Sequence, residues 1–405
     1  MPTRGEQMLA LRKARMAAAP AFLRGGFRPF FFGGPLWAVV ALALWLCAFF
    51  GGLNLPTGLD ALSWHRHEML FGFAGAAIAG FLLTAIPNWT GRLPIAGSPL
   101  AALFGLWAAG RAVLLFSADT GLVLAAVLDV GFYLVLALVA GREVIAARNR
   151  NKPVVFGVLL FGAADAIDYA GAAGLIADSQ LGHRAGIALV IALISLIGGR
   201  IVPSFTRNWM ARQGWATGLP NQPDRFDLAV LACTVLGLLA WVSVPDAAPT
   251  GIALIAAASL QLARLARWRG WRTIADPLVL ILHIGYLWIP IGLLLLGWSV
   301  VDSSMPRTVG IHALTSGAIA TMILAVMTRA TLGHTGRELR ANATTVVAYF
   351  CVTLGAALRV AAPLQISSYR MALEAAGTLW IAAFILFLVR YGPLLFGAKP
   401  GDASR

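Results

Sequence analysis

The sequence predicts an all-α, polytopic membrane protein with 12 transmembrane helices. Three observations favour this class: 59% of the 405 residues are hydrophobic, only 12% are charged, and the mean hydropathy is +0.80. Soluble domains carry about 25% charged residues. A helix needs about 20 apolar residues to cross the hydrocarbon core of a bilayer. The composition therefore excludes an ordinary soluble protein.

Twelve apolar segments meet this length requirement and are predicted membrane spans. In order they are 34–53, 66–88, 98–117, 119–141, 153–177, 183–203, 226–244, 249–266, 275–298, 308–329, 343–362 and 371–391. Because they fill the chain, we expect one transmembrane domain at 29–397. A basic tail at 1–28 precedes it, and a short tail at 398–405 follows.

Sequence signals mark where several of these spans begin and end. The first span ends at Gly51-Gly52, and the third and fourth form a tight hairpin around Ser117–Thr120. The eighth ends in the basic run Arg264–Arg272, and the ninth begins at Asp276-Pro277. Glycine, proline and charged residues interrupt or border apolar helices, so these positions are natural boundaries.

The net charge of +14 is distributed asymmetrically along the chain. Of the 31 lysines and arginines, 25 fall in the two tails, in the connections after even-numbered spans, or near the ends of those spans. Cytoplasmic loops carry an excess of lysine and arginine. We therefore expect both termini in the cytoplasm and anionic lipid as a partner. This placement argues against nucleic acid as a partner.

The fifth span contains two carboxylates, Asp165 and Asp168, at a spacing that puts both on one helix face. Ionisable residues inside a membrane are costly and need a partner or water. They either pair with Arg111 or Arg184, or carry protons. Glu68, at the start of the second span, is a further possible proton carrier.

Spans 2, 6 and 10 share a plan, which suggests a pseudo-threefold arrangement of four-helix units. Each begins with a histidine (His67, His183 and His312), and each ends in a cluster of proline, threonine or arginine. Pro87 lies 20 residues after His67, and Pro203 lies 20 residues after His183. We therefore expect the three imidazoles at a similar depth.

Imidazole is a good ligand for haem iron and for copper. This chemistry makes His65, His67, His183 and His312 candidate metal or haem ligands, although one membrane histidine alone is more often a hydrogen-bonded packing residue. His65 and His67 are two residues apart and would face different ways on a helix, so at most one points inward. The carboxylate of Glu68 could accept a hydrogen bond from a ligating imidazole and so orient it.

His283 and Arg329 are two further candidate cofactor-binding residues, whereas the cysteines are not candidates. His283 lies inside the ninth span, and Arg329 at the end of the tenth could bind a haem propionate. The three cysteines form no CxxCH motif, so any haem would be haem b, held without a covalent bond.

Several motifs together resemble the NnrS family of bacterial membrane proteins. The resembling segments are GFRPFFFGG (26–34), WHRHEMLFGF (64–73), GGRIVPSFTRN (198–208), LHIGYLW (282–288) and HALTSGAIATMILAVMTRATLGHTGR (312–337). The resemblance implies twelve spans, a location in the bacterial inner membrane, bound haem, copper, and a role in tolerance of nitric oxide and nitrosative stress.

The layout is also similar, more distantly, to the central subunit of haem–copper oxidases and nitric oxide reductases. That resemblance implies twelve helices in a pseudo-threefold arrangement, with histidine ligands on the second, sixth and tenth. The present chain departs from it: span 7 has no His-His pair, and span 10 has one histidine within the membrane. A three-histidine copper site of that kind is therefore not expected.

Three functions are consistent with these features. The first is a protein that contains haem, with or without copper, and that binds or detoxifies nitric oxide. The second is a quinol-linked nitric oxide reductase, an oxidoreductase in which Asp165, Asp168 and Glu68 would carry protons. The third is a non-enzymatic transporter of metal or haem.

Overall fold

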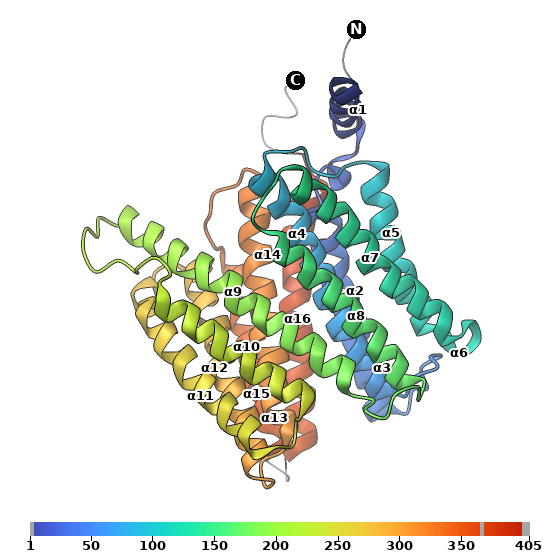
Figure 1. The fold of residues 1–405 in the computed structure, drawn as a ribbon, viewed down its shortest axis with the longest axis vertical. Helices are drawn as coiled ribbons and strands as arrows, with labels where there is room; N and C mark the ends of the chain where they lie inside the picture. Colours follow the sequence, from blue (N-terminus) through green and yellow to red (C-terminus); the bar gives the residue numbers. More distant parts are fainter. Residues whose placement is uncertain (1–3, 365–367, 399–405) are drawn as a thin grey trace. The chain divides into compact units, whose positions relative to one another are not determined.

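The computed structural model describes residues 4–364 and 368–398, and every regular element within them is a helix (Figure 1). The α-helices are α1 (Arg4–Ala18), α2 (Phe27–Gly51), α3 (Ala61–His67), α4 (Gly75–Thr90), α5 (Ser98–Leu115), α6 (Ser117–Thr120), α7 (Leu122–Ala146), α8 (Lys152–Ala172), α9 (Leu181–Arg212), α10 (Arg225–Ser243), α11 (Ala248–Arg267), α12 (Pro277–Val301), α13 (Arg307–His312), α14 (Ala320–His334), α15 (Ala343–Ala361) and α16 (Tyr369–Phe396). The remaining elements are the 3-10 turns η1 (Ala21–Leu23), η3 (Gly270–Thr273) and η5 (Ala362–Leu364), and the π-helices η2 (Glu68–Ala74) and η4 (Ala313–Ile319).

The described residues contain twelve helical segments that are long and apolar enough to cross a membrane. Their positions match the predicted spans in order, so the prediction of an all-α protein with 12 transmembrane helices is confirmed. The chain is a multi-pass membrane protein.

Most spans are longer than the sequence indicated, and the first and the sixth illustrate this. The first begins at Phe27 rather than at residue 34, because Pro29 falls in the first helical turn, where proline is tolerated. The sixth, α9, continues through Pro203 to Arg212. Near that proline the hydroxyl of Thr206 donates a hydrogen bond to the carbonyl of Val202, four residues earlier in the same helix.

The second and tenth spans contain a π-helical turn directly after their histidines. In the second span, α3 ends at His67 and η2 follows before α4 begins. In the tenth, α13 ends at His312 and η4 follows before α14 begins. The sixth span is α-helical throughout. Spans 2 and 10 therefore share a local distortion that span 6 lacks, and such π-turns often occur at functional sites.

Contacts divide the chain into two compact units. The first comprises the described residues of 1–183, 331–337 and 388–405, and the second comprises those of 184–330 and 338–387. In the first unit α4 packs against α2 and α7, while α5 and α8 also pack against α7. In the second, α11 packs against α10 and α12, and η4 packs against α12 and α15. Both units are thus helix bundles with their own buried side chains.

Candidate metal centre

Five helical elements of the first unit bring six ionisable side chains together. His67 is the last residue of α3, and Glu68 is the first residue of η2. Arg111 lies on α5, Asp129 on α7, and Asp165 and Asp168 lie one turn apart on α8. We call these six residues the acid–histidine cluster (His67, Glu68, Arg111, Asp129, Asp165 and Asp168).

The imidazole of His67 occupies the middle of the cluster. Its Nδ1 lies 3.0 Å from Asp168 Oδ2, and its Nε2 lies 3.2 Å from Asp129 Oδ2. Asp165 Oδ1 is 3.5 Å from the same Nε2. The ring also meets that of Tyr169 edge to face, with 4.7 Å between ring centroids. Three carboxylates from two helices therefore surround one buried imidazole.

Arg111 is the cation beside the remaining carboxylate. Its Nη1 donates to Glu68 Oε2 at 2.5 Å, and its Nη2 pairs with Asp129 Oδ1. The indole of Trp37 also donates to Glu68 Oε2, at 2.6 Å, and the hydroxyl of Tyr169 donates to Asp129 Oδ2 at 2.8 Å. Glu68 and Asp129 are thus held in place by donors from three helices.

The π-helix η2 and two glycines allow this close approach. A Cβ at Gly72 would lie 2.7 Å from Arg111 Nη1, and one at Gly110 would lie 2.7 Å from Asp129 Oδ1. The hydroxyl of Tyr133 donates to the carbonyl of Phe71 at 2.5 Å, and Trp107 Nε1 donates to that of Gly72 at 3.0 Å. Side chains thus donate hydrogen bonds to backbone carbonyls that would accept backbone N–H groups in a regular α-helix.

The cluster is almost fully removed from solvent, and part of it lacks hydrogen-bond partners. Relative exposure is 1% for His67, 0% for Glu68 and Asp165, and 1% for Asp129. Neither carboxylate oxygen of Asp165 accepts a hydrogen bond from the part of the chain that the structure describes. A buried carboxylate in this situation is costly unless something else binds it.

The charges of the cluster do not balance. Four carboxylates face one arginine and one histidine, and the arginine offsets only one of them. Burial makes an uncompensated charge expensive within a membrane-spanning bundle. The centre therefore needs additional positive charge, which either a metal cation or protons can supply.

The donor atoms fit a metal ion. One ligand atom each from His67, Asp129 and Asp165 lie within 4.8 Å of one another. Donors bound to one ion at about 2.0–2.6 Å lie up to about 5 Å apart. One imidazole and two carboxylates suit a divalent first-row ion such as Mn²⁺, Fe²⁺ or Zn²⁺. In addition, Asp168 at Nδ1 provides the carboxylate that commonly supports a ligating imidazole.

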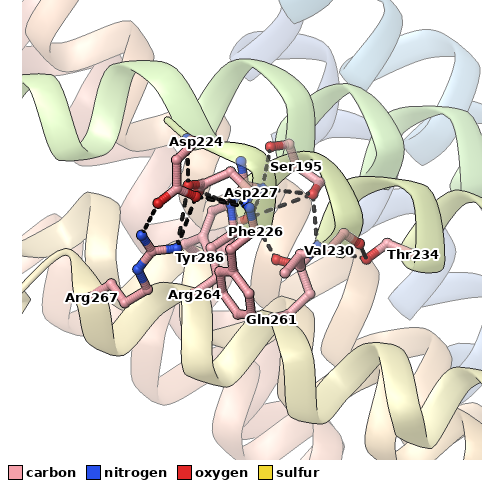
Figure 2. Close-up of polar contacts among 10 residues, drawn as sticks. All are labelled: Ser195, Asp224, Phe226, Asp227, Val230, Thr234, Gln261, Arg264, Arg267 and Tyr286. Atoms are coloured by element: carbon pink, nitrogen blue, oxygen red, sulfur yellow. Dashed lines mark hydrogen bonds and ion pairs between the residues drawn. The ribbon is translucent and has the colours of Figure 1, made fainter. Parts of the chain in front are cut away.

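A polar network in the second unit shows what a fully compensated buried cluster looks like in this chain (Figure 2). Arg264 donates to Asp227 at 2.8 Å and to the hydroxyl of Tyr286 at 3.0 Å, and Tyr286 donates to Gln261 at 2.7 Å. Gln261 in turn donates to Ser195 and Thr234. Arg267 also pairs with Asp224, so two arginines face two aspartates, and each side chain named here has a hydrogen-bond partner. We interpret this network as structural.

Comparison with known proteins identifies the family. The family model described as NnrS protein matches residues 21–399, which is nearly the whole chain and includes the acid–histidine cluster. The chain belongs to the NnrS family. No curated protein matches it.

Haem does not fit at His67 of this NnrS-family chain. An axial ligand must direct one ring nitrogen at the iron with room for the porphyrin. Both nitrogens of His67 instead face carboxylates at 3.0 and 3.2 Å, and the side chain is fully enclosed. The predicted haem-binding role of His67 therefore lacks structural support, whereas a small cation suits its surroundings.

The other predicted ligands in the first unit lie outside the cluster. The ring of His65 stacks on Trp45 of α2, with 4.2 Å between centroids. His183 is buried at the start of α9, and it is not among the residues whose ligand atoms converge with those of His67. The sequence placed His65 and His67 on different faces, and the structure gives them different surroundings.

The predicted cofactor-binding residues of the second unit have separate environments. His283 Nε2 lies 2.7 Å from the hydroxyl of Thr206, and the imidazole packs against Gly270. His312 Nδ1 lies 2.7 Å from the carbonyl of Thr308, within its own helix. Arg329 lies over the ring of Phe205, 4.1 Å from its centroid. Each contact is one that a packing residue makes.

Asp165 and Asp168 have a different partner from the arginines that the sequence suggested. Both face His67, whereas Arg111 pairs with Glu68 and Asp129, and Arg184 donates to the carbonyl of Val242 at 3.0 Å. Asp129 is not among the site residues predicted from the sequence. An aspartate in the middle of a 25-residue apolar helix was the available signal.

Proposed function

We propose that this protein acts in the nitric oxide response of the bacterial inner membrane and that a divalent metal ion in the acid–histidine cluster is its working centre. Family membership supports the physiological role. The observation that carries the metal centre is the buried excess of carboxylates around His67, with both oxygens of Asp165 lacking hydrogen-bond partners in the described residues.

A bound divalent ion would offset most of the negative charge of the cluster. It would offset the charges of Asp129 and Asp165, while Arg111 offsets that of Glu68. Asp168, whose side chain is 15% exposed, would accept a hydrogen bond from the Nδ1–H of His67 and so orient the ring toward the ion. When bound, such an ion supplies a Lewis-acidic coordination position for a small ligand such as nitric oxide.

The chain's own residues would perform three tasks at this centre. His67, Asp129 and Asp165 would bind the ion, and Tyr169 would hold Asp129 in orientation through its hydroxyl. Phe71, Phe161 and Tyr133 pack around the cluster and exclude water from it. The proton-carrier role of Asp165, Asp168 and Glu68 stays a prediction, because protons are the other way to supply the missing charge.

The test is a metal analysis of the purified protein. Wild type, His67→Gln and Asp165→Asn are purified without chelators, analysed by mass spectrometry for metals, and titrated with Mn²⁺ under electron paramagnetic resonance. His65→Gln is the matched control, because it makes the same change two residues away, outside the cluster. We expect about one metal ion per chain in wild type and control, and a loss of affinity of at least about tenfold in the two ligand variants.

Two results would contradict the metal centre. The first is wild-type protein that contains no divalent metal and binds no added Mn²⁺; protons would then supply the missing charge. The second is equal metal binding by all four proteins. Pyridine haemochrome analysis of wild type, His65→Gln and His312→Gln tests the predicted haem b and its proposed ligands His65 and His312.

The physiological role needs a test in cells. A strain lacking the gene is complemented with wild type or with Asp165→Asn and exposed to a nitric oxide donor. We expect wild type to restore growth and the variant to fail at equal protein level. Failure of wild type would refute the nitric oxide role, and full rescue by Asp165→Asn would remove the cluster from it. Consumption of nitric oxide with a quinol donor would favour the reductase function instead.

Membrane orientation is part of the proposal. The lysine and arginine asymmetry supports cytoplasmic termini, with anionic lipid against the basic side.

A further inference from the structure

A second site, apart from the acid–histidine cluster, lies in the second unit where two connections meet. One connection joins α11 to α12 and contains η3, and the other follows α9 and runs over residues 213–224. Arg272 of η3 lies over the ring of Trp215, 4.5 Å from its centroid. Arg207 of α9 donates to the carbonyl of Pro220 at 3.2 Å. The 213–224 connection is thus held both at η3 and at α9.

Two guanidinium groups converge at Gly218 in this connection. A Cβ at Gly218 would lie 2.7 Å from Arg269 Nη1 and 3.0 Å from Arg272 Nη1. Gly218 has a φ of +69°, in the left-handed region that favours glycine. Arg269 also has a positive φ, of 56°, which is uncommon for a residue with a side chain. Backbone strain of this kind persists where surrounding contacts fix it, and here it accompanies two like charges held close together.

Neither arginine has an acidic partner among the residues that the structure describes. Within those residues the side chains of Arg269 and Arg272 make no hydrogen bond and no ion pair, and Arg272 contacts a ring rather than an acceptor. The nearby Arg267 differs, because it pairs with Asp224 (Figure 2). The positive-inside rule accounts for arginines on this side, but not for two that converge without an anion. Two like charges repel, so a bound anion would stabilise the pair.

Backbone donors are available beside the two guanidinium groups. Within the described part of the chain, the N–H groups of residues 216–219 donate to no backbone or side-chain acceptor. Guanidinium and backbone N–H groups together are the donors that bind oxyanions in proteins. Because Gly218 has no side chain, the space between the two guanidinium groups is not filled by a Cβ.

We propose that Arg269 and Arg272 bind the phosphate group of an anionic phospholipid beside Gly218. The planar guanidinium group matches the oxygens of a phosphate with two parallel hydrogen bonds. The proposal rests on the proposed contact of anionic lipid with the basic side of the protein, and it assigns that contact to one site. Inorganic phosphate has the same chemistry and is the other source to test.

The place of the site in the fold indicates a lipid as the source. η3 lies between the end of one membrane span at Arg267 and the start of the next at Pro277. The ends of membrane spans lie at the level of lipid headgroups, where basic sites bind anionic lipid. Trp271 and Ile274, in the same connection, are 60% and 69% exposed. Exposed apolar side chains beside two arginines suit the boundary between headgroups and acyl chains, and a soluble ion needs neither of them.

The experiment measures lipid retention by the full-length protein. Wild type, Arg269→Gln and Arg272→Gln are purified in detergent, titrated with phosphatidylglycerol, and analysed by native mass spectrometry. Arg225→Gln, at an exposed position at the start of α10 in the same unit, is the matched charge control. A parallel arm titrates inorganic phosphate into delipidated protein and follows binding by calorimetry.

A second pair of variants tests the geometry of the site without changing charge. Gly218→Ala adds a methyl group between the two guanidinium groups, whereas Gly214→Ala adds one where nothing lies within 4 Å. Gly214 has a φ of +83°, so both substitutions strain the backbone of the same connection. A difference between them therefore reports the space at Gly218 rather than the strain.

We expect one tightly retained phosphatidylglycerol in wild type, Arg225→Gln and Gly214→Ala. Retention should be about tenfold weaker in Arg269→Gln, Arg272→Gln and Gly218→Ala, because each removes or displaces a charge-assisted hydrogen bond. Retention that these three variants leave unchanged, or that the two controls weaken equally, would overturn the site and leave the wider contact with anionic lipid in place. Wild type that retains no phosphatidylglycerol would overturn both, and binding of inorganic phosphate alone would assign the arginines to a soluble ion instead.

Discussion

Arg111 is the cation on which the buried carboxylates of the first unit depend. It is 2% exposed, donates to Glu68 at 2.5 Å and pairs with Asp129. The substitution Arg111→Gln retains a polar side chain but removes the charge and the two-pronged geometry. Glu68 and Asp129 would then remain buried with an uncompensated charge.

The expected cost follows from this burial. Removing one partner of a buried ion pair costs about 3–5 kcal/mol, because the other partner stays desolvated. Placing a single charge at the centre of a membrane helix costs about 2.5–3.5 kcal/mol on insertion scales. We therefore expect Arg111→Gln to lower the free energy of unfolding by about 3–5 kcal/mol, which is more than about a hundredfold in the folded-to-unfolded ratio.

The assay is denaturant unfolding in detergent micelles, followed by the fluorescence of the 13 tryptophans. Arg370→Gln is the matched control: it removes the arginine of a surface pair with Glu374, whose side chains are 70% and 47% exposed. Surface pairs contribute about 0–1 kcal/mol. The double variant Arg111→Gln/Glu68→Gln should regain part of the loss, because it also removes one unpaired charge.

An equal loss of unfolding free energy in Arg111→Gln and Arg370→Gln, of less than about 1 kcal/mol, would refute this role of Arg111. Water or an ion already present in the cluster would then be compensating Glu68 and Asp129, and Arg111 would not be their essential partner.

Two further predictions concern the second unit. Tyr286→Phe removes the hydroxyl that donates to Gln261 and accepts from Arg264, so the free energy of unfolding should fall by about 1–2 kcal/mol. The metal content should stay unchanged. Loss of metal would mean that the network in Figure 2 is not merely structural. Asp224 caps α10, and a hydrogen bond from Arg267 holds the pKa of its carboxyl below the usual value. Its ionised form therefore adds stability above the unfolded-state pKa of about 3.9, and this contribution is lost as the pH falls through the lower folded-state pKa. The difference in unfolding free energy between wild type and Asp224→Asn should therefore be smaller below pH 4 than at pH 7. An equal difference at both pH values would contradict this role of Asp224.

The sequence by itself determined the membrane class and the order of the spans. Hydropathy and span length are local properties that sum along the chain, so twelve apolar segments specify twelve helices whatever their packing. The family was also visible in short motifs such as WHRHEMLFGF, and the match over residues 21–399 confirms it. The spacing of Asp165 and Asp168 correctly placed both on one helix face, since both contact His67.

Only the tertiary structure decided which ionisable residues meet. Asp129 is one aspartate in an apolar helix, and nothing near it in the sequence indicates that α7 brings it to His67. The π-turn after His67 interrupts the 3.6-residue period on which facing arguments rest, so the directions of His67 and Glu68 could not be derived from spacing. Partner choice depends on which helices pack together, and the apolar faces of α5, α7 and α8 look alike in sequence. The buried carboxylates around His67 are therefore a property of the packed bundle, because burial is what gives their unbalanced charge its cost.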